Sequence, residues 1–192
     1  MTGQVQFDSY EAAGAVVAVN LVNELTLEHA FGRPIQRLDP FLAVRQVLDV
    51  DPPFARLRER DVPGLVTLAK RLREIFRNLH NGDPDAAAGG LNGLLAAHPA
   101  HPHLAKDHGH WRMHHHPADA AVVPMATAVC AEAMARIVGA GDGSRLGTCH
   151  SHDCDRVFLD GSKNGSRRFC STTCQNRVKA TAFRRRQAAS DL

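Results

Sequence analysis

Four of the five cysteines lie near the C-terminus in two close pairs. The spacing is Cys149-x4-Cys154, then fifteen residues, then Cys170-x3-Cys174. This layout is typical of zinc, because each short spacing lets one turn present two sulfurs to the same ion. We therefore predict that these four thiolates bind one Zn²⁺. Four sulfurs leave no open position for water, so the ion would be structural rather than catalytic.

The segment between the pairs is too polar to fold by burial alone. Its only large apolar side chains are Val157, Phe158, Leu159 and Phe169. Metal binding supplies about 10–16 kcal/mol in structural zinc peptides. We expect zinc to hold this segment together.

Other uses of these cysteines stay open at this stage. Two disulfides would suit a secreted chain, but the first residues, MTGQVQFDSYEAAG, lack the cationic region of a signal peptide. An iron–sulfur cluster is a further alternative, and either His150 or His152 could replace a sulfur. Cys130 lies in an apolar stretch and is expected to be buried.

The residues around the cysteines predict a hairpin. Residues 156–160 have the composition of a strand, 161–165 contain turn residues, and 166–170 would return as the second strand.

A helix is expected to follow, from about Cys174 to Gln187, with Ser171, Thr172 and Thr173 available to cap it. Helical spacing would place Cys174, Val178 and Ala182 on one stripe against the metal.

Charge is distributed unevenly along the chain. Residues 1–148 hold 14 Lys/Arg against 16 Asp/Glu, whereas residues 149–192 hold 9 against 4. A positive end on a near-neutral body favours an anionic partner, with double-stranded DNA the leading candidate. The alternative is a solubilising tail.

Several side chains of this basic end are candidates for nucleic-acid binding. Gln175 and Asn176 could read base edges or bond at the helix start. The cations expected at phosphates are Arg167, Arg168, Arg177, Lys179, Arg184, Arg185 and Arg186.

The sequence CSTTCQNRVKATAFRRR, preceded in the chain by VFLD and SRRFC, resembles the CGNR zinc finger, a treble-clef-like module of bacterial transcription regulators. Gln175 stands where that family has its name-giving glycine, and Asn176 and Arg177 are retained. In that family the finger follows an ABATE domain. The order here agrees, with LVNEL at 21–25 and a hairpin before the last helix of that domain. The resemblance implies a ligand-sensing domain followed by a DNA-binding finger.

The remainder of the chain predicts a mainly helical domain. Helices are expected over 8–29, 40–50, 64–80, 83–98 and 119–139, with a hairpin at 103–114 that turns at Gly109. The fold class is thus α+β, a mainly helical N-terminal domain with a β-hairpin followed by a treble-clef-like finger. The expected divisions are a domain over 1–140, a glycine-rich linker over 141–148 and the finger over 149–192.

Eight of the twelve histidines fall between His98 and His116. Alternation along a strand would place His110, His114 and His116 on one face. The cluster indicates either a metal, haem or pH sensor or an exposed polar strand.

Asn20 and Asn23 lie among apolar residues of the first helix and need partners. Either they bind a small-molecule effector or they form internal hydrogen bonds.

The sequence therefore favours a cytoplasmic, zinc-dependent, DNA-binding regulator that senses an effector or forms a homodimer. An RNA- or protein-binding zinc module is the alternative. No Gly-rich phosphate loop, nucleophile elbow or HExxH motif indicates an enzyme, and a site built from the hairpin histidines is the one enzymatic alternative that stays open. The most apolar run, 120–131, is too short to cross a membrane.

Overall fold

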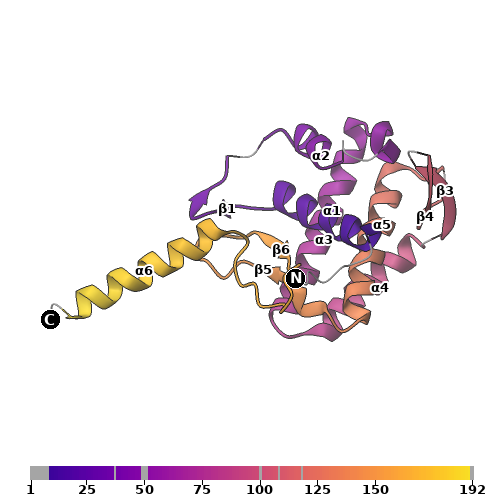
Figure 1. The fold of residues 1–192 in the computed structure, drawn as a ribbon. Helices are drawn as coiled ribbons and strands as arrows, with labels where there is room; N and C mark the ends of the chain where they lie inside the picture. Colours follow the sequence, from indigo (N-terminus) through magenta and orange to yellow (C-terminus); the bar gives the residue numbers. More distant parts are fainter. Residues whose placement is uncertain are drawn as a thin grey trace.

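Helices make up most of the body. The computed structural model describes residues 9–36, 38–48, 52–99, 101–107, 109–117 and 119–190. Figure 1 shows the body helices gathered together while the C-terminal helix projects from one end. The body helices are α1 (Ser9–Leu25), α2 (Pro40–Leu48), α3 (Val62–His80), α4 (Pro84–Ala97) and α5 (Val122–Gly139).

The predicted helices are confirmed, with shifted ends. The first ends at Leu25 instead of continuing to residue 29, and α3 begins two residues early, at Val62. Asp83 caps α4 by accepting a hydrogen bond from the Ala86 N–H at 2.9 Å. The expected end points at residues 8 and 50, and His108 of the hairpin, lie outside the described residues.

Helix α5 lies at the centre of the core. It is long and apolar enough to meet the criteria for a membrane span, but 61% of it is buried inside the protein. Cys130 on this helix is fully buried, as expected, and burial raises the pKa of its thiol to about 12. The apolar character of α5 is therefore explained by its place in the core.

Gly14 allows α1 and α5 to approach closely. A Cβ at this position would lie 2.7 Å from the Ala133 Cβ and 2.8 Å from the Val129 carbonyl oxygen. Any side chain here would push the two helices apart.

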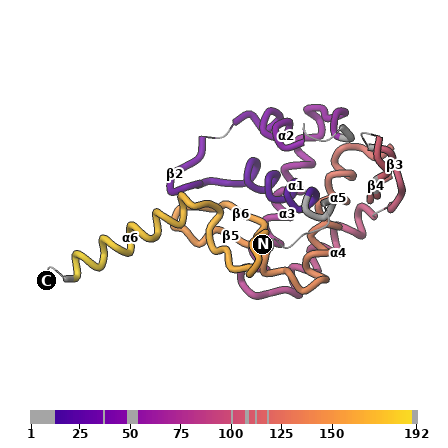
Figure 2. The backbone as a smooth tube through the Cα atoms, viewed as in Figure 1, coloured from indigo at the N-terminus to yellow at the C-terminus, as the bar shows by residue number. Residues whose placement is uncertain are grey.

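The described residues also form three short antiparallel hairpins, two in the body and one in the cysteine segment. They are β1 (His29–Ala30) with β2 (Arg33–Pro34), β3 (His103–Asp107) with β4 (His110–His114), and β5 (Leu146–Thr148) with β6 (Val157–Leu159). The β3–β4 hairpin turns at Gly109, which has a φ of +85°. It lies at the end of the molecule opposite the projecting helix (Figure 2). Short 3-10 helices, η1 (Pro52–Arg56), η2 (Glu59–Asp61) and η3 (Gly143–Arg145), connect the longer elements.

The partner of the strand within the cysteine segment was predicted wrongly. β6 pairs with β5, not with residues 166–170, which form no strand. The backbone N–H of Arg167 is instead bound by the Asp160 carboxylate at 2.7 Å. Residues 141–148, where glycines suggested a linker, contain η3 and β5, and Leu146 belongs to the core.

The C-terminal helix α6 (Thr172–Ser190) is longer than predicted and mostly exposed. Ser171 caps it, because its Oγ accepts a hydrogen bond from the Cys174 N–H at 3.3 Å. Cys174 is buried and Val178 is half-buried, but Ala182 is exposed. The predicted apolar stripe therefore packs only over the first turns, since the helix then leaves the body.

Candidate metal centre and basic surface

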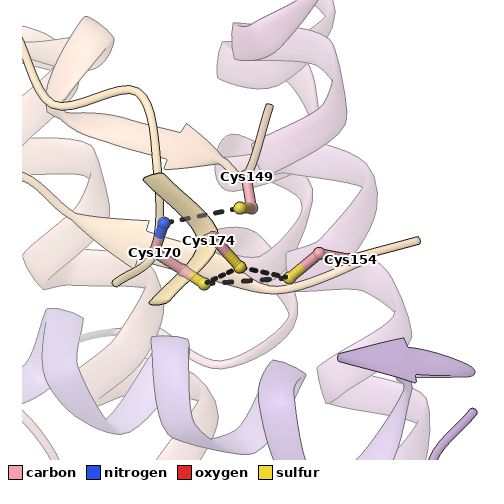
Figure 3. Close-up of side chains that lie close together, drawn as sticks. All are labelled: Cys149, Cys154, Cys170 and Cys174. Carbon is pink, nitrogen blue, oxygen red and sulfur yellow. Dashed lines mark hydrogen bonds between the residues drawn. The ribbon is translucent and has the colours of Figure 1, made fainter. Parts of the chain in front are cut away.

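The four predicted cysteines converge on one point (Figure 3). Cys149 follows β5, Cys154 precedes β6, Cys170 precedes α6, and Cys174 lies in its first turn. The sulfurs of Cys154, Cys170 and Cys174 form a triangle with all three sides 3.7 Å. All four sulfurs lie within 4.8 Å of one another.

This spacing fits zinc. With a Zn–S distance of about 2.3 Å, tetrahedral sulfurs lie roughly 3.8 Å apart. Three of the sulfurs already have that separation, and Cys149 completes the set. The four cysteines are thus clustered as a zinc site, as predicted.

The pKa values of three thiols in this close cluster are shifted in opposite directions. The pKa of the Cys149 thiol is lowered to about 4. The largest cause is the hydrogen bond from the Cys170 thiol, and the backbone N–H groups of Cys170 and Ser151 lower it further. The pKa of Cys170 is raised, mainly by the same bond to Cys149. The pKa of Cys154 is raised mainly by burial. Four thiolates this close need a bound cation to ionise together.

The loop between β6 and Cys170 is held by two buried charged side chains. Asp160 is 1% exposed, and its carboxylate accepts hydrogen bonds from the Ser162 N–H at 2.8 Å and the Arg167 N–H at 2.7 Å. Arg145 donates to the carbonyls of Asp160 and Ser162 and to the Asp142 carboxylate. Sequence reasoning missed both roles, although a lone acid before a long basic run was a signal for Asp160.

The metal segment is also bound to the helical body. Asp155 accepts hydrogen bonds from the backbone N–H groups of Glu28 and His29, and its carbonyl accepts one from Arg73. The Gly32 N–H donates to the Asp153 carbonyl at 2.9 Å. A short segment, residues 28–34, therefore lies directly against the first cysteine pair. Phe31 in this segment donates its N–H to the Cys154 sulfur.

Asn23 makes the most buried of these connections. Its amide donates to the Val157 carbonyl at 3.0 Å and accepts from the Val157 N–H at 2.9 Å. Asn23 is 3% exposed. Internal hydrogen bonding, one of the two alternatives from the sequence, accounts for this side chain. Asn20 is half-buried on the same helix, and its role as an effector contact stays a prediction.

The candidate nucleic-acid residues divide into two groups. On α6, the exposed members are Gln175, Asn176, Lys179, Arg184, Arg185 and Arg186. Arg167 and Arg168 lie before the helix and are also exposed, but their side chains have local partners. Arg167 donates to the Phe169 and Cys170 carbonyls and lies 4.9 Å from the Phe158 ring centroid. Arg168 lies 3.5 Å from His150 Nδ1.

Arg177 is half-buried and braces the first cysteine pair. Its guanidinium donates to Ser151 Oγ at 3.1 Å and to the His152 carbonyl at 3.2 Å. It also packs across Gly32, where a Cβ would lie 1.9 Å from Nη2. The structure thus gives Arg177 a bracing position in addition to its charge.

Two hollows flank the base of α6. One, of about 330 Å³, is lined by Ser151, His152, Arg177, Val178, Thr181, Ala182, Arg185 and Arg186. The other, of about 720 Å³, is lined by Ala30, Phe31, Gly32, Arg33, Thr173 and Arg177. Both surfaces are basic, and Arg33 of the helical body contributes to the second.

A four-cysteine zinc site, carried by a small hairpin and the first turn of a basic helix, defines a zinc-finger protein with a helical body. Residues 145–187 match the CGNR zinc finger. Residues 15–141, more than half of the chain, match ABATE, described as "Putative stress-induced transcription regulator". The chain belongs to this family, and the resemblance stated from the sequence is confirmed. A search of the curated proteins found no match.

Proposed function

We propose that this chain is a cytoplasmic transcription regulator whose zinc finger docks on double-stranded DNA through α6. The supporting observation is the form of that helix. It projects from the body, carries no acidic side chain, and exposes Lys179, Arg184 and Arg185. Nineteen residues make a helix about 28 Å long. The major groove of B-DNA, about 12 Å wide, admits such a helix.

Contacts are assigned by position along α6. Lys179, Arg184, Arg185 and Arg186 bind phosphates, with Arg167, Arg168 and Arg177 near the base of the helix. Gln175 and Asn176 are exposed in the first turns, where amides can pair with adenine edges. Because several arginines near the base also hold the finger together, we expect the outer part of α6 to provide most of the salt-dependent affinity.

The helical body supplies regulation. We assign residues 1–140 to a domain that senses a small-molecule effector or dimerises, 141–148 to the connection, and 149–192 to the finger. One module buries only about 600–1,000 Å² on DNA. A homodimer would double this contact and provide the specificity that a single finger lacks. The chemistry is binding rather than catalysis, in keeping with the family description.

The test is a salt titration of binding to duplex DNA. The zinc-loaded full chain is compared with a variant in which Lys179, Arg184 and Arg185 are replaced by alanine. A control variant loses three exposed cations elsewhere: Arg45, Lys70 and Arg71. The slope of log K against log salt should fall by about 0.9 for each lost phosphate contact in the α6 variant, and the control should retain the wild-type slope.

Equal losses of DNA affinity in both variants would mean that net charge alone drives binding. Tighter binding to single-stranded RNA than to duplex DNA, with the same dependence on α6, would replace DNA by RNA as the partner. Retention of full affinity by the α6 variant would refute the proposed docking surface.

A further inference from the structure

We propose that His103, His114 and His116 on the β3–β4 hairpin form a second metal site, which takes a divalent transition-metal ion through three imidazoles. This site is separate from the cysteine cluster, because the hairpin lies at the other end of the molecule (Figure 1). It uses residues that neither the zinc finger nor the proposed DNA surface requires.

The hairpin register brings the three side chains together. His103 and His114 are directly opposite each other in the antiparallel pair. His116 lies two residues beyond His114, and residues two apart share a face in an extended chain. All three rings are neighbours: their centroids are 5.6 Å apart for His103–His114, 5.9 Å for His103–His116 and 5.5 Å for His114–His116.

These separations suit a shared ion. With metal–nitrogen distances of about 2.0–2.1 Å, the ring centroids of imidazole ligands in a tetrahedral site lie roughly 5 Å apart. Among the described residues, the cysteine cluster is the one group whose donor atoms are already gathered for a metal. For any choice of ring nitrogens, at least one pair of these histidines therefore has its donor atoms more than 4.8 Å apart. The rings have to turn so that these nitrogens approach to roughly 3.3 Å when the ion binds.

Two of the rings are already held in the tautomer that a metal needs. His103 Nδ1 lies 3.1 Å from the His101 carbonyl, and His116 Nδ1 lies 2.9 Å from the Pro117 carbonyl. A carbonyl oxygen only accepts, so each Nδ1 carries a proton, and in the neutral ring the lone pair is then on Nε2. Carbonyl partners of this kind commonly orient metal-binding histidines.

The two faces of the hairpin differ in solvent exposure. His116 is 6% exposed, and His103 and His114 are half-buried. The opposite face exposes Leu104, Trp111 and Met113. Three imidazoles without sulfur favour zinc, copper or nickel over magnesium or calcium. Three protein ligands also leave a position for water or an exchangeable ligand, unlike the closed four-cysteine site.

Ni²⁺ titration of the full chain tests this proposal. The protein carries no affinity tag and keeps zinc at its cysteines, and calorimetry measures binding. We expect one additional ion per chain. His103→Gln and His116→Gln should each weaken its binding at least tenfold. His110→Gln, which changes an exposed histidine of the same hairpin, should leave it unchanged.

Folding is checked separately from binding. Each variant should retain the helical circular dichroism of the wild type, and His103→Gln, at a half-buried position, keeps the test decisive if His116→Gln unfolds. Nickel should also raise the melting temperature of the wild type but not of His103→Gln. The proposal is overturned if no additional ion binds, or if the His110 variant loses as much affinity as the His103 and His116 variants.

Discussion

The arginines of the finger show that one residue type serves two purposes. Arg145 and Arg167 direct their guanidinium groups at backbone carbonyls of the loop around Asp160 and Cys170. Arg184 and Arg185 are exposed on α6. A charge count treats these residues alike, but the first pair supports a loop that has few apolar side chains. The basic composition of this segment is therefore partly a requirement of its folding.

At the scale of single residues, we expect the ionised carboxylate of Asp160 to stabilise the finger. Burial of its carboxyl opposes ionisation, but hydrogen bonds from Ser162 and Arg167 and the charge of Arg145 outweigh burial and lower the pKa. Its stabilising effect should be complete above the unfolded-state pKa of about 3.9 and disappear as pH falls through the lower folded-state pKa. Asp160→Asn should cost about 1–3 kcal/mol at neutral pH, because one partly buried N–H loses its acceptor.

Denaturant unfolding of both proteins between pH 3 and pH 7 measures this effect. The difference between wild type and variant should shrink only at the acid end. A difference that is constant over this range would show that the ionised carboxylate has no special role. Asp142→Asn, at a more exposed carboxylate on the same arginine, is the control and should cost less.

At the scale of elements, α6 is attached to the rest of the finger through Arg177 and Cys174. Arg177→Ala should lower the stability of the finger by about 1–2 kcal/mol, because the Ser151 and His152 contacts and the packing on Gly32 are lost. Arg184→Ala removes the same charge from the exposed part of the helix and should leave stability unchanged. Thermal unfolding and zinc retention against a chelator measure the two variants.

If α6 docks on DNA as proposed, both variants bind it more weakly, so stability is the property that separates them. If Arg177→Ala retains zinc and melts like Arg184→Ala, the bracing contacts contribute nothing and Arg177 acts only through its charge.

The sequence predicted most helices of the body and all four cysteines of the metal centre, because helical periodicity and ligand spacing are local signals. It failed for the strand at 166–170, since strand pairing is a contact between segments. The VFL strand could pair with either flanking segment, and Leu146, which fits the core, decides in favour of β5. The grouping of His103 with His114 and His116 likewise depended on the hairpin register.

At the scale of the whole molecule, the finger and the helical body share a surface. The β5–β6 hairpin places Leu146 and Val157 in the same core as α1 and α3. Residues 28–34 bind the first cysteine pair through backbone hydrogen bonds. A change in the body that moves α1 would therefore reach the metal centre directly, which gives a physical route from the body to α6.

Asn23 tests this coupling. Asn23→Ala leaves the Val157 N–H and carbonyl without their buried partner, at about 1–3 kcal/mol for each unsatisfied group. Zinc should then pass to a chelator at least tenfold faster, although Asn23 lies far from every cysteine in the sequence. Asn20→Ala, on the same helix, is the matched control and should exchange zinc at the wild-type rate.

Removal of zinc by a chelator should in turn increase hydrogen exchange at Val157 and in residues 28–34 while α5 stays protected, because α5 lies in the core of the body. Unchanged zinc exchange in Asn23→Ala would mean that the two parts fold independently and that Asn23 does not couple the body to the metal centre.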